Sequence, residues 1–137
     1  MGEIEIRAIG RVESPLTDLE SAPRQADEGA PKAWLVFEPE VLEGLRSLRP
    51  GHEVIVLTWL DRARRDVLSV HPRGDASRAQ EGVFSTRSPH RPNPIGLHRV
   101  EITTVDGRRV QVGCLEALDG TPILDVKPVL SEDTNER

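Results

Sequence analysis

The alternation of apolar and polar positions predicts short β-strands along most of the chain. Residues 3–9 alternate charged and apolar side chains, which is the period of a strand with one buried face. Residues 33–37, 67–70 and 82–86 are further short candidate strands. Residues 54–59 form a continuous apolar run rich in β-branched side chains, which predicts a strand buried on both faces.

Two Asp-Gly pairs predict tight turns in the second half of the chain. Residues 95–105 and 108–118 flank Asp106-Gly107, and Asp-Gly between apolar runs is a strong hairpin signal. Asp119-Gly120 precedes a last candidate strand over residues 123–126. Residues 39–48 place apolar side chains at helical spacing after Pro39, which predicts one short amphipathic helix.

These elements predict an all-β fold of about seven or eight strands with one short helix. The eleven glycines and eleven prolines keep the elements short, and too few helices remain to cover an open sheet. A closed or nearly closed β-barrel removes the exposed edges of such a sheet. We expect residues 1–130 to form one domain and residues 131–137 a polar tail.

Charge is unevenly distributed along the chain. The formal net charge is −5, yet residues 61–99 carry eight basic and four acidic side chains, and residues 84–99 carry no carboxylate. Such a segment suits an anionic ligand. The alternative is a solvated segment whose arginines pair with the acidic residues on either side of it.

Several chemistries find no support in the sequence. The single cysteine, Cys114, excludes a disulfide framework and lies in an apolar pattern that predicts a buried, inert thiol. No two of the four histidines have metal-binding spacing, so we predict no metal site. The GxGxxG, phosphate-loop and GxSxG motifs are absent. No signal peptide or membrane span is evident, which predicts a cytoplasmic protein.

The segment richest in candidate chemistry is residues 82–96, Gly-Val-Phe-Ser-Thr-Arg-Ser-Pro-His-Arg-Pro-Asn-Pro-Ile-Gly. Its three prolines fix φ and remove three backbone donors, so the segment forms a stiff loop that cannot join a sheet. A rigid loop loses little entropy when it binds. With its Arg and Asn side chains, it is a suitable platform for a charged small molecule or a nucleotide.

This loop, together with ordered blocks at residues 9–15, 23–25 and 118–128, resembles the signature of the TrmO family, also called YaeB or TsaA-like. These proteins are S-adenosylmethionine-dependent tRNA methyltransferases. The resemblance implies a β-barrel unlike the Rossmann methyltransferases, with S-adenosylmethionine bound at or near a homodimer interface. It further implies N6-methylation of threonylcarbamoyladenosine at position 37 of the tRNA anticodon loop.

The resemblance also assigns cofactor contacts to individual residues. These are Pro23, Arg24, Gln25, Arg87, Leu118, Asp119, Gly120 and Thr121. An arginine such as Arg24 or Arg87 can hold the methionine carboxylate through two parallel hydrogen bonds. Gly120 would let the backbone approach a ligand closely. For Asp119-Gly120, an ordinary turn is the alternative interpretation.

Methyl transfer from a sulfonium asks little of acid–base groups, because alignment and exclusion of water supply most of the acceleration. An exocyclic amine must still lose a proton, and Asp119 and Asp125 are the candidate acceptors. The candidate substrate-binding residues are His71, Arg91 and Asn93. We expect RNA contacts there and along the basic segment that contains Arg62, Arg64, Arg65 and Arg73.

Departures from the family pattern leave the acceptor open. The chain resembles the short single-domain forms, carries Leu60 and Val129 where histidine and tyrosine are usual, and has few aromatic side chains for stacking bases. Three functions are therefore considered. They are tRNA methylation, methylation of a small metabolite, and non-catalytic binding of S-adenosylmethionine or a nucleotide.

Overall fold

The computed structural model describes residues 2–18 and 31–130. Within these ranges the elements are eight strands and three short 3₁₀ helices. The strands are β1 (Gly10–Glu13), β2 (Ala33–Phe37), β3 (Glu53–Trp59), β4 (Ser69–Val70), β5 (Glu81–Gly82), β6 (Ile95–Asp106), β7 (Arg109–Val112) and β8 (Pro122–Pro128). The 3₁₀ helices are η2 (Pro39–Leu45), η3 (Pro72–Gly74) and η4 (Val83–Ser85).

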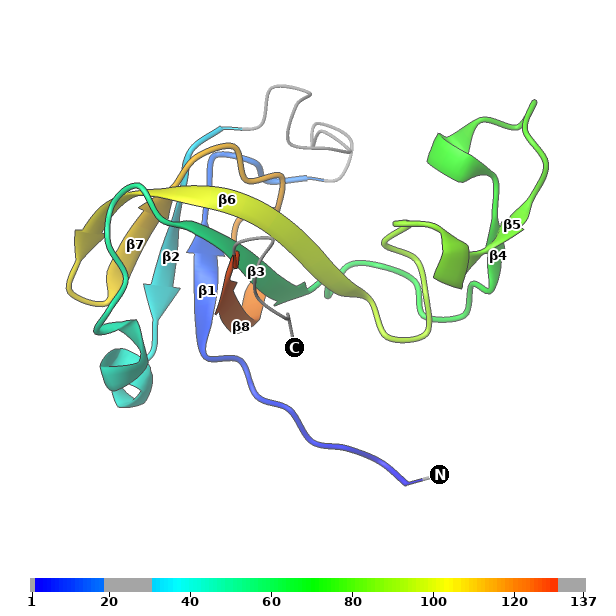
Figure 1. The fold of residues 1–137 in the computed structure, drawn as a ribbon. Helices are drawn as coiled ribbons and strands as arrows, with labels where there is room; N and C mark the ends of the chain where they lie inside the picture. The colour runs from blue at the N-terminus through cyan, green and yellow to red at the C-terminus, as the bar shows by residue number, and fades with distance from the viewer. Residues whose placement is uncertain (1, 19–30, 131–137) are drawn as a thin grey trace.

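Six of the strands pair into a closed ring in the order β1-β2-β7-β6-β3-β8 (Figure 1). All of these pairings are antiparallel, and β8 returns to β1 with Gly10 opposite Ile123. Closure leaves none of the six with an unpaired edge. The all-β prediction is therefore confirmed, but β4 and β5 form a separate two-stranded sheet.

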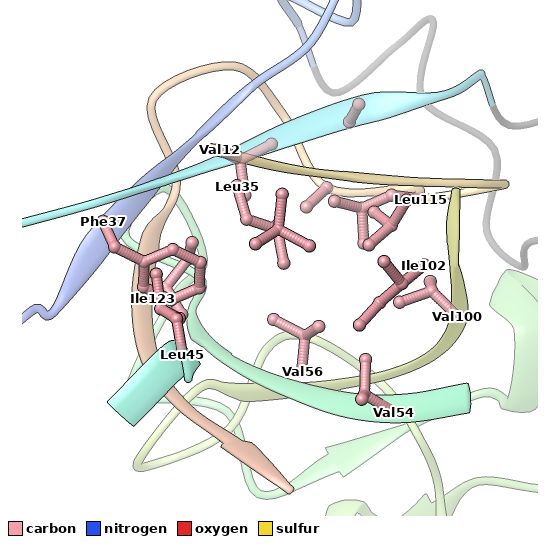
Figure 2. Close-up of a cluster of buried hydrophobic side chains, with 14 residues drawn as sticks. Val12, Leu35, Phe37, Leu45, Val54, Val56, Val100, Ile102, Leu115 and Ile123 are labelled. Atoms are coloured by element: carbon pink, nitrogen blue, oxygen red, sulfur yellow. The ribbon is translucent and has the colours of Figure 1, made fainter. Parts of the chain in front are cut away.

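The hydrophobic core fills the ring, because alternate side chains of β1, β2, β3, β7 and the first part of β6 are buried in it, together with Ile123 of β8 (Figure 2). The buried side chains at its centre include Leu35, Val56, Ile102, Val110 and Ile123. Burying one such side chain contributes roughly 1.5–3 kcal/mol. This core makes the ring a stable frame for the loops at its ends.

β3 corrects one prediction. Val54, Val56 and Thr58 are buried, but the residues between them are only partly covered. An antiparallel strand in a closed ring has one face inside and one outside, so its outer apolar side chains are left half-exposed. The prediction that residues 54–59 form a strand buried on both faces is therefore wrong.

Residues 3–9 form no strand despite their alternation. Ile9 donates its backbone N–H to Ile123 O, but residues 2–7 are exposed, Ile4 and Ile6 among them. Alternation alone cannot make a strand without a neighbouring edge to pair with. The predicted strand over residues 82–86 is also wrong, because only β5 and the 3₁₀ turn η4 occur there.

The elements around the predicted hairpin and helix are shorter than expected. β6 and β7 are joined at Asp106-Gly107 as predicted, with Gly107 at a φ of 58°. β7 ends at Val112, and Cys114 is exposed with a φ of 54°, so the prediction of a buried thiol is wrong. The predicted helix is the 3₁₀ helix η2, in which Leu45 alone is fully buried.

Residues 60–94 leave the ring between β3 and β6 and form a separate projection, called the lobe below (Figure 1). It contains β4, β5, η3 and η4, and its core residue Val83 is buried. The lobe therefore holds most of the proline-rich loop and most of the basic segment. No helix in the described ranges is long and apolar enough to cross a membrane.

Candidate functional site

The proline-rich loop is held together by the guanidinium group of Arg91. Arg91 Nη1 donates to Thr86 O and Ser88 O, and Nη2 donates to Val83 O, each at 3.0 Å. The side chain is half-buried. In the structure this guanidinium braces the loop, and the substrate contact predicted for Arg91 stays a prediction.

A second brace joins the loop to residues 60–66 at the base of the lobe. Arg65 Nε donates to Pro92 O at 2.7 Å, and Arg65 Nη2 donates to Asn93 Oδ1 at 2.9 Å. The same guanidinium lies 5.1 Å from the ring centroid of Trp59, within cation–π range. Asn93, a predicted substrate contact, is exposed, and its side-chain carbonyl oxygen accepts this hydrogen bond from Arg65.

Histidine side chains of the lobe also make internal hydrogen bonds. His90 Nδ1 accepts the backbone N–H of Arg64 at 3.0 Å. His71, predicted to bind substrate, lies 2.8 Å from Arg78 O through its Nδ1. Arg64 forms a two-pronged pair with Asp66, and that guanidinium holds the pKa of the Asp66 carboxyl below its ordinary value.

Arg87 differs from these arginines. It is exposed and makes no hydrogen bond or ion pair within the described residues. Arg91 fixes the carbonyl groups of Thr86 and Ser88 on either side of it. The loop therefore holds the backbone of Arg87 rigidly while its guanidinium is free to bind an anion.

The second part of the candidate site is the turn of residues 118–121. Asp119 N donates to Leu16 O and Gly120 N to Val12 O, both at 2.7 Å, while Asp119 Oδ1 accepts from Ser14 N at 3.0 Å. Gly120 has a φ of 83°, which glycine adopts without strain. One oxygen of the Asp119 carboxylate thus ties the turn to the backbone of Ser14. This contact is structural, in line with the alternative interpretation of Asp119-Gly120 as a turn.

The surface beside this turn is hollowed by a shallow depression of about 340 Å³. Its lining includes Arg11, Arg108, Asp119 and Gly120. The side chains of the other two turn residues, Leu118 and Thr121, are buried, so neither is presented to a ligand as the structure stands.

Among the predicted cofactor residues that the structure describes, Arg87 and the turn of residues 118–121 belong to separate parts of the chain. Arg87 lies in the lobe, whereas residues 118–121 lie against the ring, and Figure 1 shows the lobe standing away from it. Asp125, the other candidate proton acceptor, lies on β8, where its carboxylate accepts from Val126 N and pairs with Lys127 at 3.3 Å. Pro23, Arg24, Gln25 and the tail of residues 131–137 lie outside the described residues.

A buried polar group inside the ring was missed by the sequence analysis. His98 Nδ1 lies 2.6 Å from Glu116 Oε1, and His98 Nε2 lies 2.8 Å from Thr58 Oγ1. Thr58 is fully buried and His98 is 5% exposed. The available signal was that His98 and Thr58 occupy inward positions of two apolar strands. Among the residues that the structure describes, no three His, Cys, Asp or Glu side chains gather as a metal site.

Comparisons with known proteins define the class of this chain. Residues 11–133 match the model of the tRNA-methyltransferase O N-terminal domain, and the chain belongs to that family. A relative from Archaeoglobus fulgidus, named S-adenosyl-L-methionine-binding protein, is 43% identical over 122 residues, covering 89% of this chain and 86% of the relative. Another from the same organism, named probable S-adenosyl-L-methionine-binding protein, is 44% identical over 93% of this chain and 34% of the relative.

Solved structures agree with this assignment. Two crystal structures of TrmO from Pseudomonas aeruginosa superpose with TM-scores of 0.74 and 0.71, at 27% and 28% identity. The superpositions cover 100% and 98% of this chain, but only 62% and 61% of the two TrmO chains. The chain therefore spans about three fifths of these TrmO chains and about a third of the longer archaeal relative. The resemblance to the TrmO family is confirmed.

Proposed function

We propose that this protein binds S-adenosylmethionine and transfers its methyl group to N6 of threonylcarbamoyladenosine at position 37 of tRNA. The observation that carries the proposal is the family match over residues 11–133, which includes both the Arg87 loop and the turn of residues 118–121. Archaeal relatives named for S-adenosylmethionine binding support the cofactor. The acceptor rests on the resemblance to the TrmO family.

The chemistry of the described residues fits this cofactor. Arg87 offers a free guanidinium for the methionine carboxylate, in the two-pronged arrangement that such pairs adopt. The Asp119 oxygen that does not hold Ser14 N can accept from an amino or ribose hydroxyl group. Gly120 carries no Cβ, and nothing lies within 4 Å of where one would stand, so a ligand has room there. Arg24 is assigned the same chemistry by the resemblance.

When bound, S-adenosylmethionine supplies a methyl group already activated by a positive sulfur. The task of the protein is to align the acceptor nitrogen with the sulfur–methyl bond and to exclude water. In the proposed acceptor N6 is a urea nitrogen, whose N–H proton must be accepted by a nearby group as the methyl group is transferred. Asp119 and Asp125 are the candidate acceptors among the residues of this chain.

A homodimer is part of this proposal, because Arg87 and the turn of residues 118–121 lie in separate parts of one chain, the first on the lobe and the second against the ring. In the proposed dimer, the lobe of a second copy lies beside the turn of residues 118–121 of the first. Exposed apolar side chains support such an interface, since Phe84 and Leu68 on the lobe are 79% and 64% exposed. Analytical ultracentrifugation tests this step. A wild-type dimer that Phe84→Asp converts to monomers supports it, and a wild-type monomer contradicts it.

One observation favours methylation of a small metabolite instead. Arg64, Arg65 and Arg91 are engaged in hydrogen bonds within the lobe, and Arg62 donates to Thr17 O at 2.9 Å. Fewer arginines of the basic segment are thus free for phosphates than its composition indicated. An RNA complex that contacts few phosphates would show a shallow dependence of affinity on salt.

The test of the proposal is a transfer assay with methyl-labelled S-adenosylmethionine. The acceptors are tRNA that carries threonylcarbamoyladenosine at position 37, the same tRNA without the modification, and a cell extract freed of RNA. Label in the modified nucleoside of the first tRNA alone supports the proposal. Label in a small molecule of the extract, with none in RNA, favours the alternative. Saturable cofactor binding with no transfer to any acceptor favours a binding module.

A further inference from the structure

Thr58, His98 and Glu116, called the relay below, have no assigned role; Thr58 and His98 are buried, and the Glu116 side chain is 19% exposed. They come from three parts of the chain: β3, β6 and the segment between β7 and β8. Their contacts are 2.8 Å from Thr58 Oγ1 to His98 Nε2 and 2.6 Å from His98 Nδ1 to Glu116 Oε1. Thr58 and His98 lie beside a cluster of buried hydrophobic side chains (Figure 2), and the other buried polar residue in the described ranges is Thr121. Polar groups in such an interior cost free energy unless they are fully hydrogen-bonded, and a packed apolar trio would serve stability at least as well.

The order of donors in this relay follows from the chemistry of the three groups. A carboxylate only accepts hydrogen bonds, so His98 carries its proton on Nδ1 and donates it to Glu116. In the neutral ring, Nε2 then accepts, and the Thr58 hydroxyl donates to it. The histidine tautomer and ring orientation are thereby fixed from both sides.

The relay joins two segments of the chain that lead to the two halves of the candidate site. His98 is two residues beyond Gly96, the last residue of the proline-rich loop, and Glu116 is two residues before Leu118, the first residue of the turn. The relay also leaves no room for a side chain at Gly96, because a Cβ there would overlap Thr58 Oγ1 and lie 2.7 Å from His98 Nε2.

Glu116 also fixes a stretch that has few other polar anchors. Leu115 N donates to Pro31 O and Asp119 N donates to Leu16 O. For residues 116–118, the hydrogen bond of Glu116 to His98 is the one hydrogen bond to a ring strand among the described residues. The carboxylate is therefore placed to set where the turn of residues 118–121 begins.

We propose that Glu116 and His98 are positioning residues that hold the turn of residues 118–121 in register with the end of the proline-rich loop for S-adenosylmethionine binding. This rests on the proposed function. Thr58 and His98 are closed off from solvent inside the ring and touch no ligand, and the partly exposed Glu116 has one carboxylate oxygen held by His98. The relay acts through the backbone of the segments to which its members belong.

The test combines calorimetric titration with S-adenosylmethionine and ¹⁵N NMR of histidine-labelled protein. Glu116→Ala should weaken binding by about tenfold, the order expected when a hydrogen bond to a charged group that orders a binding segment is lost. Glu116→Gln should restore most of the affinity, because the side-chain carbonyl still accepts from Nδ1. Glu101→Ala is the matched control, an exposed glutamate on β6 whose removal changes net charge equally.

The spectra give a readout that general loss of stability would not move. The wild type and Glu116→Gln should show the Nδ1–H tautomer of His98, and Glu116→Ala should lose it. If Glu116→Ala does not fold, Glu116→Gln and Thr58→Val carry the same comparison of affinity and tautomer. Wild-type affinity in a folded Glu116→Ala, or an Nε2–H tautomer in the wild type, would overturn the proposal. Failure of the wild type to bind S-adenosylmethionine refutes the proposed function instead, and with it this role.

Discussion

Replacing Gly96 by alanine places a methyl group against the buried contact between Thr58 and His98. The added Cβ would overlap Thr58 Oγ1, lie 2.7 Å from His98 Nε2 and lie 3.2 Å from Leu60 Cδ2. Real Cβ atoms essentially never approach another heavy atom within 3.0 Å, so at least one of these side chains must move. Thr58 is β-branched and lies in the middle of a closed sheet, so it has few rotamers available.

The cost of Gly96→Ala can be worked from these contacts. Overpacking of a well-packed interior costs typically about 1–3 kcal/mol. Displacing Thr58 also leaves a buried ring nitrogen without its donor, which costs a further 1–3 kcal/mol or so. Because one movement causes both effects, we expect a loss of about 2–4 kcal/mol in the free energy of unfolding.

Urea denaturation of wild type and variant measures this loss directly. Gly44→Ala is the control, because a Cβ at Gly44 meets nothing within 4 Å, and the change should be neutral or slightly stabilising. Thr58→Ala should absorb part of the Gly96→Ala effect in a double-mutant cycle, since it removes the overlapping oxygen. A loss below about 0.5 kcal/mol for Gly96→Ala would refute the packing argument.

Four further predictions concern the loop and the surface. Arg87→Ala should reduce the binding free energy of S-adenosylmethionine by about 1–3 kcal/mol without changing the thermal midpoint, and unchanged affinity would reject the contact. Arg91→Ala should make the loop sensitive to limited proteolysis and weaken cofactor binding through Arg87; a loop as resistant as the wild type's would count against the brace. Arg99 lowers the pKa of Glu53, so their pairing stabilises the fold above the ordinary carboxyl range and is lost as the pH falls through the lowered pKa. In Glu53→Gln the thermal midpoint should therefore fall less than in the wild type as the pH is lowered from about 5 to about 3, and an equal fall in the two proteins would disprove the linkage. The exposed thiol of Cys114 should react with a disulfide reagent in the native protein, and reaction only on unfolding would contradict its position.

The local signals in the sequence predicted the ring well. Alternating apolar positions identified β2 and β6, and the Asp-Gly pair identified the hairpin between β6 and β7. These signals are local, because a two-residue turn and a period of two depend on neighbours in the chain. Residues 3–9 had the same period but no edge to pair with, and pairing depends on the whole topology.

The chemistry of the site was only partly predictable for the same reason. Composition identified the proline-rich loop, but whether an arginine braces it or faces solvent depends on which carbonyls lie nearby. The residue types around Arg91 and Arg87 do not tell which of the two braces the loop. In the structure the Arg91 guanidinium is hydrogen-bonded within the loop, whereas Arg87 faces solvent. The relay of Thr58, His98 and Glu116 joins residues 40 and 18 positions apart, and no spacing rule predicts such a contact.

The most direct test of cofactor binding is calorimetric titration of the purified protein with S-adenosylmethionine and with S-adenosylhomocysteine. We expect saturable binding of both, because the carboxylate, amino and ribose groups that Arg87 and residues 118–121 would contact are common to the two. Arg87→Ala should weaken the binding of both while the protein stays folded. Absence of saturable binding by the folded wild-type protein would contradict S-adenosylmethionine binding, and it would leave the proline-rich loop with a structural role alone.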